Sequence, residues 1–196
     1  MTSKRDLEAA VRERFANLAR RPETESRFPV GRAGATVAGY PADALDALPE
    51  GAIASFAGVG NPLALSPPSP GDVVVDVGCG AGLDGLLAAR DVGPQGRVTG
   101  VDFSKEMIEK ARANARLMGV AHAGFIVGAA DALPLPSGTA DLVVTNGVLN
   151  LCVDKPAVVR EFFRVLRPGG RLQMADILLE DHAASPALDR PGEWSA

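Results

Sequence analysis

The residues best suited to chemistry form a glycine-rich turn, Gly78 to Gly82, with an acid, Asp102, lying 20 residues beyond it. Glycines let a backbone approach a ligand closely. The unpaired N–H groups at the start of the following helix favour a negatively charged ligand group. A carboxylate at the position of Asp102 can accept hydrogen bonds from both hydroxyls of a ribose. The pattern therefore predicts a nucleotide-like ligand.

A strand, a helix and a second strand must position this turn. The apolar run Val73–Val77 precedes it, a helix is predicted over Leu83–Val92, and the second strand ends at Asp102. Asp76 interrupts the first run, and its burial is expected to require hydrogen bonds from loop N–H groups. This order of elements is typical of an α/β domain that binds its ligand at the carboxyl end of the first strand.

The remaining core repeats this alternation. Helices are predicted over Lys105–Met118 and Lys155–Leu166, and later strands over Asp141–Asn146 and Arg171–Ile177, with another strand-like run before Asp131. Alternating strands and helices imply a parallel sheet with right-handed crossovers. The helix after Ser104 shows the usual signals, an N-cap at Ser104 and a stop at Gly119. Its inward-facing residues are predicted to be Met107, Ile108, Ala111 and Ala115.

The N-terminal third has a different character. An amphipathic helix is predicted from Leu7, Val11, Phe15 and Leu18. Arg20–Gly39 is rich in Arg, Pro, Gly and Thr and is predicted to be a loop or strap. Tyr40–Phe56 is predicted to hold two short helices split at Pro49. We therefore divide the chain into an N-terminal extension at 1–60, a ligand-binding core at 61–179 and a tail at 180–196.

The glycine turn alone leaves the ligand open, because Gly80 to Gly85 also matches the dinucleotide pattern G-x-G-x-x-G. The rest of the chain decides against a dinucleotide. Taken in order, VGCGAG, VDFSKEMIEKAR, DALP and VLRPGG resemble the class I S-adenosylmethionine-dependent methyltransferases, from about residue 61 to residue 179. A dehydrogenase remains a distant alternative, which NADH binding would revive.

The resemblance implies a fold and a cofactor. The fold is α/β, a doubly wound, mostly parallel Rossmann-like sheet, and the cofactor is S-adenosylmethionine. The resemblance places the methyl-transfer edge at the end of the fourth strand, so Asn146 is the candidate catalytic residue; a turn Asn that caps Gly147 is the competing interpretation. The candidate cofactor-binding residues are Asp76, Gly78, Cys79, Gly80, Gly82, Asp102, Phe103, Met107, Ala130, Asp131 and Asn146.

A narrower resemblance, to the arsenite methyltransferases, comes from the segments PEG, SFAGVGNP, TNGVLNLCVDK and ADI. Val59 and Gly147 stand where the arsenic-binding cysteines of that family stand. The two cysteines present, Cys79 and Cys152, are expected to be small apolar residues rather than metalloid ligands. Arsenite is therefore disfavoured as the acceptor, and no metal site is predicted.

The class I fold usually has seven strands, the last two forming a hairpin beside strand five. Residues 180–196 are too few for a hairpin of normal length, so the last two strands are expected to be lacking. An exposed parallel edge is normally covered. The tail, the N-terminal helix or a second subunit, as in a homo-oligomer, is expected to cover it. Alternatively, the chain is a fragment of a longer protein.

Composition argues against nucleic-acid-binding, membrane and disulfide-rich secreted proteins. The 196 residues carry a formal net charge of −4, with both signs interspersed and no basic stripe for nucleic acid. No apolar run is long enough for a bilayer, and the N-terminus lacks a signal core. Two cysteines do not make a disulfide framework, so a cytoplasmic location is expected.

The function predicted from these observations is methyl transfer from S-adenosylmethionine to a small-molecule acceptor, with no nucleic-acid or membrane partner. A protein that binds the cofactor but is catalytically idle or regulatory is the alternative from a different class. Acceptor screening beside cofactor binding separates the two.

Overall fold

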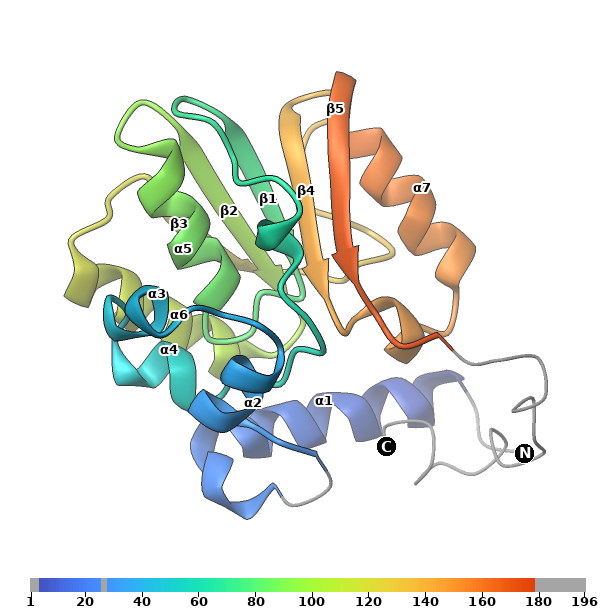
Figure 1. The fold of residues 1–196 in the computed structure, drawn as a ribbon. Coiled ribbons are helices and arrows are strands. Elements are labelled where there is room, and N and C mark those ends of the chain that lie inside the picture. Colours follow the sequence, from blue (N-terminus) through green and yellow to red (C-terminus); the bar gives the residue numbers. More distant parts are fainter. Residues whose placement is uncertain (1–3, 26–27, 179–196) are drawn as a thin grey trace.

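The computed structural model describes residues 4–25 and 28–178, and one parallel sheet dominates them (Figure 1). Its strand order is β3-β2-β1-β4-β5, and every pair is parallel. The α/β fold with a doubly wound parallel sheet is confirmed. The strands are β1 (Val73–Val77), β2 (Arg97–Asp102), β3 (Ala123–Val127), β4 (Ala140–Asn146) and β5 (Leu166–Ala175).

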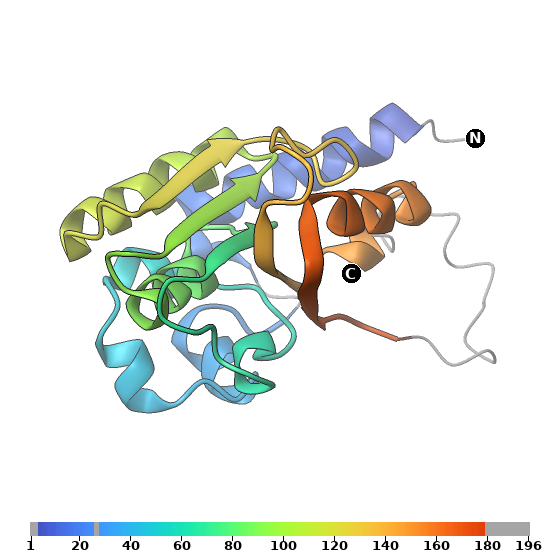
Figure 2. The ribbon, with the colours of Figure 1, turned by 90° about the horizontal axis from the view of Figure 1, so that it is seen from above.

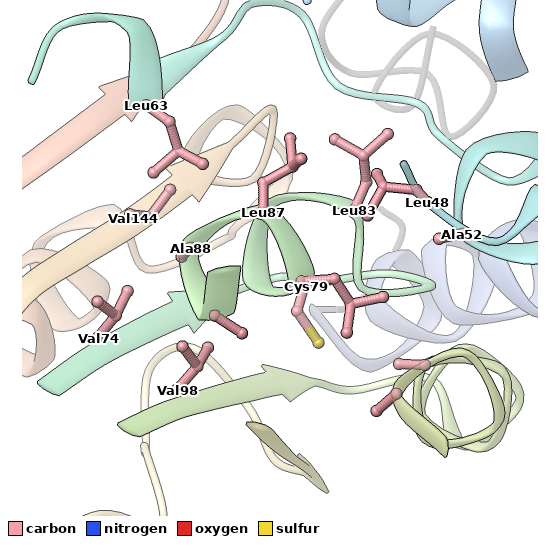
Figure 3. Packing of buried hydrophobic residues seen from close by; sticks show 14 of the residues in the cluster. Leu48, Ala52, Leu63, Val74, Cys79, Leu83, Leu87, Ala88, Val98 and Val144 are labelled. Atoms are coloured by element: carbon pink, nitrogen blue, oxygen red, sulfur yellow. The ribbon is translucent and has the colours of Figure 1, made fainter. Parts of the chain in front are cut away.

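The side chains of β1 alternate between two apolar layers, as a strand buried on both faces requires. Val74 faces a cluster with α5 (Leu83–Val92) and α6 (Lys105–Met118), whereas Val75 faces a cluster with α7 (Lys155–Val165). Figure 3 shows part of the first cluster, in which Leu83 and Leu87 of α5 lie between the sheet and the N-terminal helices. The sheet is therefore the middle of three layers.

The helix predictions in the core are confirmed, apart from the last residue of α7. The Ser104 hydroxyl accepts a hydrogen bond of 3.3 Å from Met107 N–H at the start of α6, and Gly119 ends that helix at φ +67°. Helix α7 ends at Val165, one residue before its predicted end. The inward-facing residues of α6 are all buried: Met107, Ile108, Ala111 and Ala115.

Helix α1 (Lys4–Arg20) lies against α6 and runs across the carboxyl ends of the strands (Figures 1 and 2). Its buried residues include Val11 and Leu18, as the predicted amphipathic pattern requires. Lys110 of α6 donates to the carbonyl oxygen of Ala19 at 3.2 Å, and Arg20 pairs with Glu106. This placement makes α1 a wall over the edge where α/β proteins bind ligands.

The loop predicted over Arg20–Gly39 is wrong in its second half, where α2 (Gly31–Val37) forms after the short η1 (Pro22–Thr24). Small residues explain this helix, because Ala35 is fully buried and a Cβ on Gly34 would lie 2.5 Å from the Pro29 carbonyl oxygen. The two short helices predicted next are confirmed as α3 (Ala42–Asp46) and α4 (Glu50–Ala54). A further turn, η2 (Pro62–Ala64), leads toward β1.

Strand β5 both begins and ends earlier than the predicted Arg171–Ile177, since it spans Leu166–Ala175. Leu166 already pairs with Ala140, and Arg171 then pairs with Leu142, so the intervening residues of β5 bulge out of the ladder. Gly169 has φ +82° within this bulge. The Pro-Gly-Gly segment is thus an irregularity inside the strand and not a turn before it.

Two predictions about chain organisation stay predictions. The absence of the last two strands concerns residues from 179 onward, which lie outside the described residues. The division at residue 60 is not tested either, although one apolar cluster joins Tyr40, Leu45 and Ile53 to Val74 and Leu86 across it.

Within residues 4–25 and 28–178, no helix is long and apolar enough to cross a membrane. In the same residues, no three His, Cys, Asp or Glu side chains gather closely enough to hold a metal ion.

Candidate functional site

A cavity of about 410 Å³ lies at the carboxyl edge of the sheet, where the strand order reverses between β1 and β4. This position is the usual ligand site of open α/β sheets, and the volume is in the range of small-molecule sites. The glycine turn, the end of β2, the loop after β3, the end of β4 and helix α1 all contribute to the lining.

The glycine turn presents backbone to this cavity. The N–H groups of Gly78 and Cys79 donate to the Val101 carbonyl oxygen at 2.7 and 3.1 Å, which ties the turn to β2. Gly80 has φ +51°, and a Cβ built on it would meet open space. A Cβ on Gly78 would instead lie 2.2 Å from Val148 Cγ2. The turn therefore needs glycine at both positions for different reasons, close packing at Gly78 and an open approach to the cavity at Gly80.

Asp102 lines the cavity at the end of β2 and is held on both oxygens. Its Oδ2 accepts from Gly80 N–H at 2.9 Å and its Oδ1 from Ser104 N–H at 2.8 Å. Burial raises the pKa of Asp102 to about 6, and the two backbone hydrogen bonds and nearby Arg12 limit the rise. Each oxygen retains acceptor capacity, so the carboxylate can take two further donors such as vicinal hydroxyls.

Apolar side chains line the cavity beside Asp102. Phe103 and Met107 line the cavity, and Arg12 of α1 donates to the Phe103 carbonyl oxygen at 2.8 Å while its guanidinium lies 5.3 Å from the Phe103 ring centroid. Ala130 and Asp131 line the cavity from the loop after β3. Ala132 N–H donates to Ala129 O at 3.2 Å, which closes a tight turn around Ala130 and Asp131.

Asn146, at the end of β4, fixes the segment that precedes the core. Its Oδ1 accepts from Val59 N–H at 2.8 Å, and its Nδ2 donates to Gly60 O at 2.7 Å. The Gly147 N–H donates to Ala175 O, so Asn146 does not act as a cap for Gly147. The catalytic role predicted for Asn146 stays a prediction, and the structure adds another role, the anchoring of residues 59–60.

The same amide belongs to a buried polar network with Tyr40 and Asp84. The Tyr40 hydroxyl donates to Asp84 Oδ1, and Asn146 Nδ2 lies 3.1 Å from the Tyr40 oxygen and 3.2 Å from Asp84 Oδ2. Burial raises the pKa of Asp84 to about 6, while the hydrogen bonds from Tyr40 and Asn146 lower it. Burial, and then the charge of Asp84, raise the pKa of Tyr40. Asp84 and Asn146 line the cavity, and Tyr40 supports them from behind.

Val59 and Gly147 come together in space although 88 positions separate them in the sequence. A Cβ built on Gly147 would lie 3.5 Å from Val59 Cγ1, and Gly147 has φ +68°. The two positions that the arsenite methyltransferase resemblance assigned to thiols therefore face each other, occupied here by a methyl group and a bare backbone.

Both cysteines line the cavity, and neither forms a disulfide. Burial raises the pKa of Cys79 well above its usual range, and the charges of Asp76 and Asp102 add to this. Burial likewise raises the pKa of Cys152 to about 11, and its thiol donates to Val148 O at 3.3 Å. Protonated thiols are poor nucleophiles and poor metalloid ligands, which favours the packing role for both.

Two predicted site residues lie outside the cavity lining. Asp76 is buried behind the turn, where it accepts a hydrogen bond from the Gly85 backbone and its Oδ2 has no hydrogen-bond partner among the described residues. Gly82 has φ +95°, and a Cβ there would lie 3.2 Å from the Phe125 ring. Both positions support the turn from behind, and a role for either in binding the cofactor stays a prediction. The other predicted site residues all line the cavity: Gly78, Cys79, Gly80, Asp102, Phe103, Met107, Ala130, Asp131 and Asn146.

Sequence reasoning missed Tyr40 and the lining residues of α1. Glu8 and Arg12 project from the predicted helix, but nothing in the local pattern says where that helix docks. A signal existed for Tyr40, which is the chain's single tyrosine and lies among short helical pieces rich in small apolar residues.

Comparison with known proteins extends this description. A family model described as a methyltransferase domain matches residues 68–190. An arsenite methyltransferase from Halobacterium salinarum is 41% identical over 140 residues, which cover 71% of this chain and 36% of the relative. A demethylmenaquinone methyltransferase from Listeria welshimeri is 37% identical over 106 residues, covering 54% of this chain and 45% of that protein.

Solved structures give the same picture. CrArsM, an arsenic(III) S-adenosylmethionine methyltransferase from Chlamydomonas reinhardtii, superposes with a TM-score of 0.56 at 34% identity, over 76% of this chain and 50% of that one. A SAM-dependent methyltransferase from Aquifex aeolicus has a TM-score of 0.55 at 26% identity, over 64% of this chain and 65% of that one. The chain spans less than half the length of the two curated relatives.

Proposed function

This chain belongs to the methyltransferase domain family, and we propose that it transfers a methyl group from S-adenosylmethionine to a small-molecule acceptor. The observation that carries the proposal is the arrangement of Gly80 and Asp102 at the cavity wall. An exposed backbone turn and an acid with spare acceptor capacity match an amino-acid end and a ribose within one ligand.

The other lining residues fit the remaining parts of this cofactor. Phe103 and Met107 offer apolar surface for the faces of an adenine, and Ala130 and Asp131, which also line the cavity, could contact the edge of its ring. Gly78 and Cys79 continue the backbone surface of the turn. These residues therefore hold and orient the cofactor in our proposal, and Asp76 and Gly82 keep the turn in shape.

S-adenosylmethionine supplies an activated methyl group on a sulfonium. A lone pair of the acceptor forms the new bond to the methyl carbon, and the carbon–sulfur bond breaks with its electrons staying on sulfur. The protein's part is to bring the two together in line and to exclude water. Helix α1, which walls the cavity, serves the exclusion of water.

The acceptor would meet a mainly apolar wall. The cavity lining after β4 includes Val148, Leu151 and Val153. Val59 packs against Gly147 at the start of the same segment. The turn η3 (Leu149–Leu151) is held by Asp176, whose Oδ2 accepts from Leu149 N–H at 2.7 Å. This wall supports a small acceptor with apolar surface and gives arsenite no converging thiolates.

Isothermal titration calorimetry tests the cofactor assignment. We expect S-adenosylmethionine and S-adenosylhomocysteine to bind at one site, and NAD neither to bind there nor to compete. Tighter binding of NAD than of S-adenosylhomocysteine would overturn the assignment. Incubation with labelled cofactor and a panel of small acceptors then tests transfer.

A further inference from the structure

The cavity holds far more negative than positive charge. The acids Glu8, Asp84, Asp102, Asp131 and Asp154 line it, whereas Arg12 is the one Lys or Arg side chain among the described lining residues. Arg12 lies at the Asp102 end, where it donates to Phe103 O and lowers the pKa of Asp102. The other end, around Asp84, has no such cation among the described lining residues.

Asp84 is a buried acid whose hydrogen-bond partners, Tyr40 and Asn146, are neutral. Only 7% of it is exposed, and its hydrogen bonds come from the Tyr40 phenol and the Asn146 amide. A charge held this way is costly unless an opposite charge arrives. Asp84 also lines the cavity, so a cationic ligand group can supply that charge.

Asp76 and Asp84 are neighbouring buried acids. Burial raises the pKa of both carboxyls, and the charge of Asp84 raises the pKa of Asp76 further, so the two are not expected to be charged together. Tyr40 and Asn146 both lie within hydrogen-bond distance of Asp84, whereas Oδ2 of Asp76 has no hydrogen-bond partner among the described residues, so a negative charge is better stabilised on Asp84. The charge thus resides on the acid that faces the cavity.

The cofactor's chemistry indicates which group meets this charge. In S-adenosylmethionine the sulfur is bonded to the ribose 5′ carbon, so it lies beside the ribose. With the ribose on Asp102 and the acceptor at the Asn146–Gly147 edge, the sulfonium must lie between them. Asp84 lines the cavity beside this edge, because its Oδ2 lies 3.2 Å from Asn146 Nδ2.

We propose that Asp84, fixed by Tyr40 and Asn146, is the counter-charge for the sulfonium, so that the site prefers the cationic methyl donor to its neutral product, S-adenosylhomocysteine. This inference rests on the proposed function. Tyr40 and Asn146 act as positioning residues. Once the methyl group has left, the positive charge is gone from sulfur, and the product loses this part of its binding.

The test compares three ligands that share the adenosine and amino-acid parts. S-adenosylmethionine carries a sulfonium, sinefungin an ammonium in its place, and S-adenosylhomocysteine a neutral sulfur. Calorimetry at pH 7.5 would measure each dissociation constant in the full chain, in Asp84→Asn and in a control, Asp91→Asn. Asp91 is exposed, near the far end of α5 and outside the cavity lining.

In Asp84→Asn we expect the two cationic ligands to weaken about tenfold and S-adenosylhomocysteine to change less than about twofold, given a charge pair at intermediate dielectric. Asp91→Asn should change none of them. Equal weakening of all three ligands would show that Asp84 contacts their shared part or only supports the fold. No change in any ligand would equally overturn the proposal. Failure of the unmodified chain to bind any of them would refute the proposed function instead.

A second variant covers the case in which Asp84→Asn does not fold. Tyr40→Phe removes one hydroxyl that donates to Asp84 and stabilises its charge. The preference for S-adenosylmethionine over S-adenosylhomocysteine should then fall in the same direction, by at least about twofold at pH 6.5. An unchanged preference in folded Tyr40→Phe would contradict the assignment.

Discussion

Gly80 N–H donates a hydrogen bond of 2.9 Å to Asp102 Oδ2, across 22 residues of sequence. The bond joins the glycine turn to the end of the neighbouring strand and aims the carboxylate at the cavity. In Asp102→Ala we expect S-adenosylhomocysteine binding to weaken by about 1–3 kcal/mol, because the ribose hydroxyls lose a charged acceptor. Calorimetry measures the loss, and Asp91→Ala is the matched exposed control. Unchanged affinity would show that the ribose lies elsewhere.

The raised pKa of Asp102 predicts a specific dependence of stability on pH. Its folded pKa of about 6 lies above the ordinary value of 3.8, so the folded state holds the proton more tightly than the unfolded state. Burying the ionised Asp102 carboxylate therefore costs no stability below about pH 4. The cost grows as the pH rises toward 6 and reaches up to about 3 kcal/mol above pH 6. Asp102→Asn cannot titrate, so the difference in Tm between variant and parent should shift in the variant's favour from pH 4.5 to pH 7. A difference that stays constant with pH would contradict the shift.

Gly78 and Gly80 should respond differently to a methyl group. Both have positive φ, but only at Gly78 would a Cβ collide, with Val148 Cγ2 at 2.2 Å. We expect Gly78→Ala to lower the free energy of unfolding by roughly 2–4 kcal/mol and Gly80→Ala by only roughly 1–2 kcal/mol. Gly80→Ala should nevertheless weaken cofactor binding about tenfold or more, because its Cβ enters the cavity. Denaturant unfolding and calorimetry on both variants separate the effects.

Much of this site follows from local sequence signals, and the rest depends on docking. The glycine turn, Asp102, and the helices after Ser104 and Asp154 are specified by neighbours within a few residues, and the resemblance to class I methyltransferases is confirmed. The contact of Tyr40 with Asp84 is not specified by neighbouring residues. It depends on how short helices pack against parts of the chain that are distant in sequence. Helix α2 was missed for the same reason, since its small residues gain stability from the surface they pack on.

The edge of the sheet at β5 gives a further prediction. Among the described residues β5 is the outermost strand of the sheet, and the amides of residues 172–177 should be protected by the tail, by α1 or by a second subunit. Hydrogen exchange followed by mass spectrometry at several protein concentrations tests this. Protection that rises with concentration would identify a second subunit. Fast exchange of these amides in a monomer would show that the edge is bare.

Arsenite should not be methylated at rates typical of arsenite methyltransferases, even with added glutathione. As(III) is held by converging thiolates, whereas Val59 and Gly147 face each other here and the pKa values of Cys79 and Cys152 are raised. Incubation with labelled cofactor and arsenite, followed by chromatography of methylated arsenic, measures this.

Two cysteine variants interpret any arsenite turnover. Robust turnover that persists in Cys79→Ser and Cys152→Ser would mean that the acceptor is held without protein thiols. Turnover lost in Cys152→Ser alone would mean that this thiol reaches the acceptor.

The cavity is assembled from stretches of chain that are far apart, since α1, the glycine turn, Asp102 and the end of β4 all contribute to its wall. In the proposed complex no one stretch would bind the cofactor by itself, so we expect the cofactor to stabilise the complete structure and not its parts. At 100 times its dissociation constant a ligand of this kind adds about 2.7 kcal/mol to the free energy of global unfolding. A molecule in which α1 has undocked loses that contribution. Ligand present during refolding should therefore stabilise only those molecules in which the whole cavity has formed.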